Sequence, residues 1–304
     1  MEIDVKDEDG DGAGTVSWRQ LLAEAKRLLG DEREARWLCE DVSGCSGAEW
    51  IDILDEPVGQ RAVARFDALV ARRVAGEPLA YVLGHWSFRT LDLMVDARVL
   101  IPRPETEIVA EVALAHISTR RGVSTPVVVA DLGTGSGAIA LSIAAENPIG
   151  AVEVWASDVS PDAVNVARAN LAGISTRLAA HVRISEGSWF DALPDELMGR
   201  IDVLVSNPPY IAIDDPEVEA SVHQWEPASA LFGGNDGLDA YRVLAVEAPH
   251  WLSSDGVLVA EIGHRQRDGV LGLFDQASGW AEAEVSTDLA GRDRVMTARV
   301  RPSR

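Results

Sequence analysis

The apolar positions between residues 17 and 77 recur at helical spacing. "SWRQLLAEAKRLL" begins at Ser17, a residue suited to cap a helix, and repeats its apolar side chains every three or four positions. "DEREARWLCEDV" follows Gly30, and "PVGQRAVARFDALVARRVAG" opens with Pro57 and ends near Gly76, as helices commonly do. These patterns predict a small helical unit over residues 17–78.

The stretch from 79 to 104 loses this periodicity. "YVLGHWSF" and "LDLMVDARVLI" are typical of two extended segments, and "PRPETE" ends the stretch. We therefore expect a β-hairpin linker between the helical unit and the rest of the chain.

From residue 105 to residue 304 the pattern alternates between strand and helix. Short apolar strands are predicted at "PVVVADLG", "AVEVWASD", "HVRISEGS", "IDVLVSNPP" and "GVLVAEIG", with helices at "GAIALSIAAENP", "SPDAVNVARANLAG" and near 239–252. Such alternation favours an α/β fold with a doubly wound, mostly parallel sheet. The last two extended segments, "AEAEVSTDL" and "DRVMTARVRP", meet at Gly291 and predict an antiparallel edge pair, which makes seven strands.

Composition restricts the possible partners. The net charge is −22, which argues against sequence-independent binding of nucleic acid, and no apolar stretch approaches the ~20 residues of a membrane span. We therefore expect a cytoplasmic protein with no nucleic-acid or membrane partner. Cys39, Cys45 and six scattered histidines offer no metal site, and we expect the cysteines to be buried thiols.

Residues 1–16 are predicted to form an acidic, disordered extension. "DEDGDG" at 7–12 is similar to the start of a calcium-binding EF-hand loop. The twelfth position of that loop, which requires a glutamate, is Trp18 here. The stretch is therefore interpreted as a polar tail.

A glycine-rich loop, "DLGTGSGA" at 131–138, separates the first predicted strand of the sheet from its helix. Glycines let a backbone approach a ligand at a helix N-terminus. Gly133, Gly135 and Ala138 also satisfy the dinucleotide fingerprint, and Asp158, at the end of the next strand, is placed to hold a ribose. This loop therefore predicts a nucleoside ligand without distinguishing NAD from S-adenosylmethionine.

"SNPPY" at 206–210 distinguishes between NAD and S-adenosylmethionine as the predicted ligand. If "IDVLV" lies beside the first strand, Asn207 follows it at the ligand-binding edge of the sheet. The side-chain oxygen of Asn207 and the carbonyl of Pro208 can then accept hydrogen bonds from the two N–H groups of a planar amide or amine. Tyr210 can lie against the flat face of that amide or amine. Such positioning suits attack of a nitrogen on a sulfonium methyl group and has no use in hydride transfer.

These segments together resemble a known family. "GEPLAYVLGHWSF", "VLIPRPETE", "SNPPYI", "EPASALFGGNDGLDAYR" and "AGRDRVM" are similar, in the same order, to the HemK/PrmC family of peptide chain release factor glutamine methyltransferases. The resemblance runs from about 17 to 300 and implies a Rossmann-like class I methyltransferase domain at 105–304 preceded by a helical substrate-recognition domain.

The resemblance also implies individual site residues. Arg103, Glu105 and Glu107 are expected to line the cleft, and Ser188 stands where the family often has an acid. The predicted cofactor site consists of Gly133, Thr134, Gly135, Ser136, Gly137, Asp158, Trp189 and Asn207, and the predicted catalytic and substrate site of Asn207, Pro208, Pro209 and Tyr210.

The implied reaction is methyl transfer from S-adenosylmethionine to the side-chain nitrogen N5 of the glutamine in the Gly-Gly-Gln motif of class I release factors, with S-adenosylhomocysteine as the product. One alternative is a DNA or RNA base amino-nitrogen methyltransferase, which uses a similar tetrad but needs basic recognition surfaces. A second is a non-catalytic adaptor that senses a nucleoside, which has no need of the tetrad.

Overall fold

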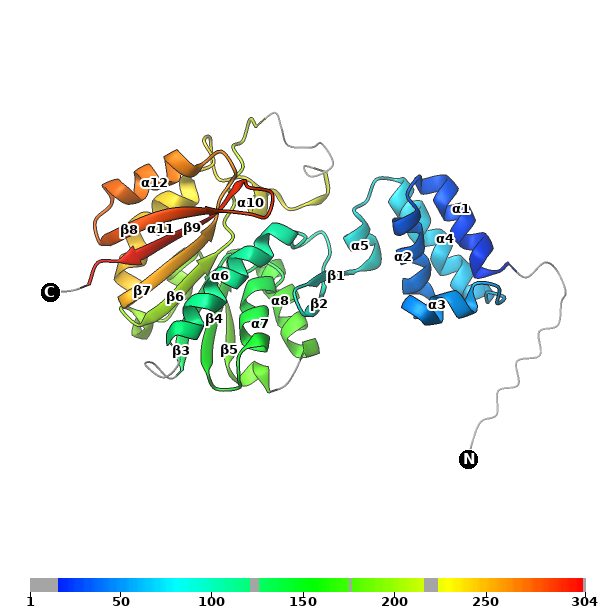
Figure 1. Cartoon of the computed structure of the whole chain (residues 1–304), viewed down its shortest axis with the longest axis horizontal. Coiled ribbons are helices and arrows are strands. Elements are labelled where there is room, and N and C mark those ends of the chain that lie inside the picture. Colours follow the sequence, from blue (N-terminus) through cyan, green and yellow to red (C-terminus); the bar gives the residue numbers. More distant parts are fainter. Residues whose placement is uncertain (1–15, 121–125, 175–176, 216–223, 303–304) are drawn as a thin grey trace. The chain divides into compact units, whose positions relative to one another are not determined.

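The computed structural model describes residues 16–120, 126–174, 177–215 and 224–302 (Figure 1). The chain forms two compact units, Met1–Leu83 and Gly84–Arg304, called here the helical unit and the α/β unit. The predicted acidic extension lies, except for Val16, outside the described residues.

The helical unit packs its helices around apolar side chains that include Leu21, Leu38 and Phe66. Gly30 and Gly44, both with positive φ, end the first two helices. The helices are α1 (Trp18–Leu29), α2 (Glu32–Ser43), α3 (Gly47–Ile53), α4 (Gln60–Val74) and α5 (Leu79–Leu83).

Helix α5 corrects the prediction of an extended segment at its position. The N–H groups of Tyr81 and Val82 both donate to the carbonyl of Pro78 at 3.0 Å. The guanidinium of Arg72 in turn donates to the carbonyls of Tyr81 and Val82 at the end of the turn. A short, fully buried apolar run does not show by its pattern whether it is helix or strand, and here tertiary contacts decide.

The two cysteines are free thiols. Cys39 is buried in α2, but Cys45 is only half-buried, in contrast to the prediction that both thiols are buried. Burial raises the pKa of the Cys39 thiol to about 12, so this group stays protonated.

The α/β unit is built on a seven-stranded sheet in the order β5-β4-β3-β6-β7-β9-β8. All strands run in one direction except β9, which is antiparallel to β7 and β8, so the predicted fold class is confirmed. The strands are β3 (Val127–Leu132), β4 (Val152–Asp158), β5 (Val182–Glu186), β6 (Ile201–Ser206), β7 (Leu252–Glu261), β8 (Trp280–Thr287) and β9 (Asp293–Val300).

Helices cover both faces of this sheet (Figure 1). One face packs against α6 (Pro104–Arg120), α7 (Ala138–Glu146) and α8 (Pro161–Ile174), and the other against α11 (Asp239–Trp251) and α12 (Arg267–Gln276). The apolar side chains of β3 alternate between the two cores, because successive residues of a strand point to opposite faces. None of the helices in the described ranges is long and apolar enough to span a bilayer.

Helix α6 was not predicted from the sequence. Its start at Pro104, with Glu105 and Glu107 in the first turn, is typical of a helix N-terminus. The two prolines of "PRPETE" were interpreted only as the end of an extended stretch, so the helix signal was missed. Its buried residues Val109 and Ile117 pack in the core on one face of the sheet.

A hairpin of β1 (His85–Phe88) and β2 (Leu91–Met94) belongs to the α/β unit. The amide of Asn170 in α8 pairs with both backbone groups of Met94, at 2.7 and 3.1 Å, and also donates to the carbonyl of Ser136 at 2.8 Å. One buried side chain therefore ties the hairpin to the glycine-rich loop.

A buried ion pair fixes the amino ends of the central strands. Asp202 in β6 accepts from the N–H of Val128 in β3 at 2.9 Å and lies 3.4 Å from Nη1 of Arg120, at the end of α6. Arg120 also contacts Asp255. Both Arg120 and Asp202 are less than 10% exposed, so the carboxylate depends on these partners for solvation.

We predict that Arg120→Met lowers the free energy of unfolding by about 3 kcal/mol or more, because it leaves the Asp202 carboxylate buried without its counter-ion. Denaturant or thermal unfolding followed by circular dichroism measures this. The control is Arg299→Met, which removes an exposed ion pair with Glu282 (3.0 Å) and should cost less than about 1 kcal/mol. Equal effects of the two variants would contradict the prediction.

Candidate active site

The strand register brings three loops to one point at the carboxyl edge of the sheet. Asp131 of β3 pairs with Ala156 of β4 on one side and with Val205 of β6 on the other. Two positions further along, Gly133 therefore lies level with Asp158 and Asn207. Because β3 lies between β4 and β6, the chain reverses its winding direction here, which is where open α/β sheets bind ligands.

The glycine-rich loop turns sharply before α7. Gly133, Gly135 and Gly137 all have φ between 58° and 86°, a region that favours glycine. The N–H groups of Gly133 and Thr134 both donate to the carbonyl of Ser157 at the end of β4. A Cβ on Gly133 or Gly135 would meet nothing within 4 Å, so these two glycines leave open space beside the backbone.

Gly137 has a different role from the other two glycines. A Cβ at this position would lie 2.8 Å from Cδ1 of Leu141, so the glycine lets the loop enter α7 closely. Gly137 accordingly packs the helix against the loop and does not line the pocket described below.

Asp131 holds the loop from beneath. Its Oδ2 atom accepts from the Thr134 hydroxyl at 2.7 Å and from the N–H of Ala140 at 3.2 Å. Its Oδ1 atom has no hydrogen-bond partner among the residues that the structure describes. Burial raises the pKa of the Asp131 carboxyl to about 7, against the opposing effect of these two donors.

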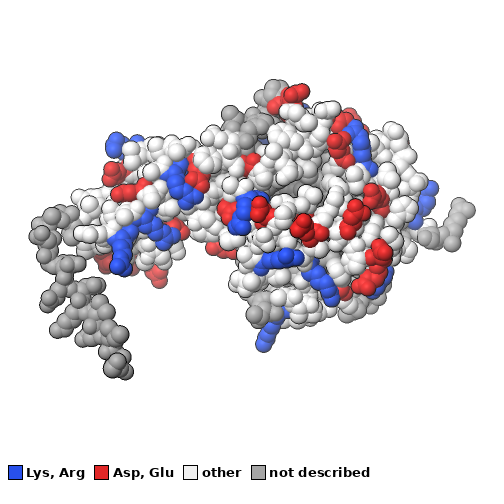
Figure 2. Space-filling view, turned by 180° about the vertical axis from the view of Figure 1, so that it is seen from behind, with Lys and Arg blue, Asp and Glu red and all other residues white. Residues whose placement is uncertain are grey.

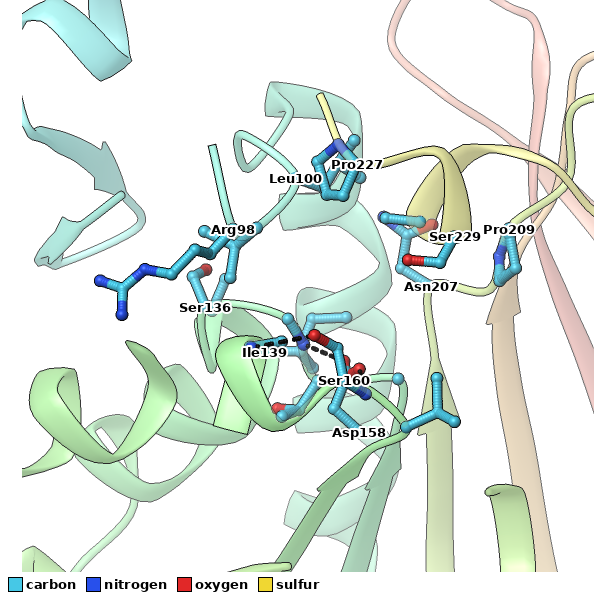
Figure 3. A pocket seen from close by; sticks show the side chains of 18 of the residues that line it. Arg98, Leu100, Ser136, Ile139, Asp158, Ser160, Asn207, Pro209, Pro227 and Ser229 are labelled. Carbon is cyan, nitrogen blue, oxygen red and sulfur yellow. Dashed lines mark hydrogen bonds between the residues drawn. The ribbon is translucent and has the colours of Figure 1, made fainter. Parts of the chain in front are cut away.

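Asp158 presents its carboxylate beside the loop. One oxygen accepts from the N–H of Gly135 and the other from the N–H of Ser160, both at 2.9 Å. Figure 3 shows Asp158 beside Ser160. Burial raises the pKa of Asp158, and the backbone donors oppose the rise. Each oxygen retains acceptor capacity, which is what a pair of adjacent hydroxyl groups needs.

A pocket opens over these groups. Figure 3 shows Asn207 and Pro209 on one side of it and Asp158 and Ser160 on the other. Trp189 also lines it, with a φ of 47°, which is unusual for a bulky residue and marks local strain. Further lining residues are Val99, Leu100, Pro102, Thr106, Ser188, Pro227 and Ala230.

A second pocket lies on the other side of Asn207. It is lined by residues that include Tyr210, Glu261 and His264. Leu100, Asn207 and Ala230 line both pockets, so the two cavities meet at Asn207. A group bound in one can therefore approach a group bound in the other at this side chain.

A chain of hydrogen bonds supports Asn207. Its Nδ2 atom donates to Oγ1 of Thr106 at 3.2 Å, and the Thr106 hydroxyl donates to Oε2 of Glu261 at 2.6 Å. The Tyr210 hydroxyl donates to the other oxygen of Glu261 at 3.3 Å. Burial raises the pKa values of both Glu261 and Tyr210, so Tyr210 is a neutral phenol.

Glycines allow the loop after β6 to pack tightly against the loop at 231–237. A Cβ on Gly233 would lie 2.4 Å from the carbonyl oxygen of Pro209, and one on Gly237 would lie 2.2 Å from that of Tyr210. The side chain of Gln266 donates to the carbonyls of Tyr210 and Gly237. Among the described residues, none donates to the carbonyl of Pro208, which remains available as an acceptor.

Arg103 forms an ion pair with the buried Glu226, which also accepts from the N–H of Ile101. This pair joins two segments that line the pockets. Glu107 instead accepts from the N–H of Arg89 at the hairpin turn, and neither Glu105 nor Glu107 lines either pocket.

The predicted site residues divide as follows. The first pocket is lined by Gly133, Thr134, Gly135, Ser136, Asp158, Trp189, Asn207 and Pro209. Tyr210 lines the second, while Gly137 and Pro208 line neither. Thr106, Glu226, Glu261 and Gln266 were not predicted. The sequence signals for three of them are weak: Thr106 lies within "PRPETE", Glu226 opens "EPASALFGGNDGLDAYR", and Glu261 ends a predicted strand.

Comparison with solved structures bears on the fold alone. The catalytic domain of hMettl16, crystallised in complex with MAT2A 3'UTR hairpin 6, superposes with a TM-score of 0.51 at 14% identity, over 81% of this chain and 83% of that one.

Comparison with family models and curated proteins goes further. A model of the PrmC N-terminal domain matches residues 16–84, and one of the methyltransferase small domain matches residues 107–224. The release factor glutamine methyltransferase of Xylella fastidiosa is 44% identical over 92% of this chain and 96% of its own. Those of Burkholderia pseudomallei (42%; 89% and 92%) and Agrobacterium fabrum (37%; 95% and 99%) are similar over comparable lengths. The chain belongs to the release factor glutamine methyltransferase family.

Proposed function

We propose that this enzyme transfers the methyl group of S-adenosylmethionine to the side-chain nitrogen N5 of the glutamine in the Gly-Gly-Gln motif of class I release factors. The observation that carries the proposal is the meeting of two pockets at Asn207. A methyl donor in the first pocket and a glutamine in the second would react at this point.

The first pocket fits the nucleoside donor. The open space beside Gly133 and Gly135 accepts a ligand close to the backbone, and the free acceptor capacity of Asp158 suits the two ribose hydroxyl groups. Trp189 provides an apolar surface for the adenine. When bound, S-adenosylmethionine supplies a sulfonium methyl group that a nitrogen can attack.

Asn207 and Pro208 would orient the glutamine amide. The side-chain oxygen of Asn207 and the carbonyl of Pro208 would accept hydrogen bonds from the two N–H groups of the glutamine amide. Tyr210 would lie against the flat face of that amide. An amide nitrogen is a weak nucleophile because its lone pair is delocalised. Acceptors that hold both hydrogens favour the pyramidal geometry of the transition state, so most of the catalysis comes from preorganisation.

The relatives' name identifies release factors as the substrates of those proteins. In a Gly-Gly-Gln segment the small neighbours let the glutamine reach into a cavity such as the second pocket. We assign the helical unit to recognition of the larger protein surface. Because release factors act on ribosomes, enzyme and substrate meet in the cytoplasm.

The face of the molecule in Figure 2 supports a protein substrate over a nucleic acid. On the α/β unit, which carries both pockets, the Lys and Arg side chains are scattered among Asp and Glu and form no continuous basic stripe over the described residues shown there. Transfer of radiolabelled methyl groups, offered in parallel to release factors, duplex DNA and tRNA, tests the proposal. Label on release factor glutamine is the expected result, and label on nucleic acid alone would overturn it.

We predict that Asp158→Ala weakens S-adenosylmethionine binding by about 10-fold or more, since charge-assisted hydrogen bonds to the ribose are lost. Isothermal calorimetry on the folded variant measures this. Asp162→Ala, which removes an exposed carboxylate from the first turn of α8, is the matched control and should bind like the parent. Unchanged affinity in Asp158→Ala would show that this residue is not the ribose anchor.

We predict that Asn207→Ala lowers the methyl-transfer rate by ~100-fold or more while cofactor affinity changes little, because one preorganised contact to the transition state is removed. Asn207→Asp keeps an acceptor but adds a charge that also attracts the sulfonium in the ground state. Its rate should fall between those of Asn207→Ala and the parent enzyme. Single-turnover methylation of a release factor measures all three, and equal rates would refute the mechanism.

A further inference from the structure

The hydrogen bonds beneath Asn207 have a defined direction. Glu261 is 1% exposed, and its carboxylate faces donors: the hydroxyls of Thr106 and Tyr210 and, at 3.8 Å, the guanidinium of Arg294. Burial raises the pKa of Glu261, but these three partners oppose the rise and stabilise the ionised carboxylate. The bond from Thr106 is 2.6 Å long, in the range of a hydroxyl that donates to a charged oxygen.

The single proton of the Thr106 hydroxyl is used in this bond. A hydroxyl has one donor and two acceptor lone pairs, so Oγ1 of Thr106 can only accept from any further partner. The partner is the Asn207 amide, 3.2 Å away, and it must therefore present Nδ2. Its Oδ1 atom is then directed away from Thr106.

We propose that Thr106 and Glu261 are positioning residues that fix which end of the Asn207 amide faces the glutamine substrate. This inference rests on the function proposed above. The two ends of an asparagine amide have nearly the same shape, so packing alone does not select one. Without the Thr106 hydroxyl, the Asn207 amide can rotate by half a turn. Its own N–H groups would then face the N–H groups of the substrate amide, and two donors that face each other repel.

Three segments of the fold converge in this relay. Thr106 lies in the first turn of α6, Glu261 ends β7, and Asn207 follows β6. Each of the three residues lies in or directly beside a helix or strand of the α/β unit, so regular secondary structure positions the relay. The threonine of "PRPETE", which also lines the first pocket, thereby acts on the glutamine through Asn207.

Thr106→Val, which has nearly the same shape, tests the proposal. We expect kcat for release factor methylation to fall by about 10- to 100-fold, while S-adenosylmethionine affinity and the KM for release factor stay within about 3-fold. Thr106→Ser, which keeps the hydroxyl, should recover most of kcat. Thr119→Val removes an exposed hydroxyl from the same helix and should have no effect.

A double-mutant cycle separates positioning through Asn207 from a general structural effect. In the Asn207→Ala background there is no amide to orient, so adding Thr106→Val should lower the rate by at most about 3-fold more. Thr106→Ala is carried through the same cycle in case valine is not accommodated. An equal cost of the Thr106 change in both backgrounds, or a loss confined to cofactor affinity, would overturn the proposal.

Methylation by the parent enzyme distinguishes a failure of the relay proposal from a failure of the proposed function. If it does not label release factor glutamine, the function is wrong. If it does and the cycle shows no coupling between positions 106 and 207, only the relay is wrong.

Discussion

The site depends on one pairing in the sheet, that of β6 alongside β3 on the side away from β4. This pairing sets the loops after the three strands level with one another. The hydroxyl of Ser206 donates to the carbonyl of Leu132 at 2.6 Å inside the core and so joins the ends of the two strands. Both faces of this parallel pair are buried in packed cores. A shift of one residue would move every side chain of the strand to the opposite face of the sheet, so the register is strongly specified.

The loop after β6 is held in place by stiff prolines and by close packing against glycines, as well as by hydrogen bonds. Pro208 and Pro209 each fix φ, so little backbone entropy is lost when the loop is ordered. The absence of a Cβ at Gly233 and Gly237 then lets the neighbouring loop contact the carbonyls of Pro209 and Tyr210. Stiffness within the loop and close packing outside it together keep Asn207 in place.

The sequence predicts the local features of this molecule better than the distant contacts. The strands, helices α1, α2, α4, α7, α8 and α11 and the glycine-rich loop follow from periodicity and from residues adjacent in the chain. Helices α3 and α12 were not predicted. Helices α5 and α6 were missed because a short apolar run and a proline-rich start have patterns shared with extended chain. Thr106 and Glu261 are 155 positions apart and Arg103 and Glu226 are 123 apart, so no local pattern reveals that they meet. The roles inferred for Asn207, Pro208 and Tyr210 come from the resemblance and from reaction chemistry, and they stay predictions.

The contacts of Asn170 determine how far this protein can be truncated from its N-terminus. A shortened enzyme that begins at Pro104 would keep the whole seven-stranded sheet and every residue of the glycine-rich loop. It would lose the Met94 backbone, which provides two of the three hydrogen bonds of the buried Asn170 amide. That amide would still donate to the carbonyl of Ser136, so the unsatisfied polar group would lie directly beside the glycine-rich loop. The minimal catalytic module of this chain therefore starts before the hairpin rather than at the first helix of the methyltransferase fold.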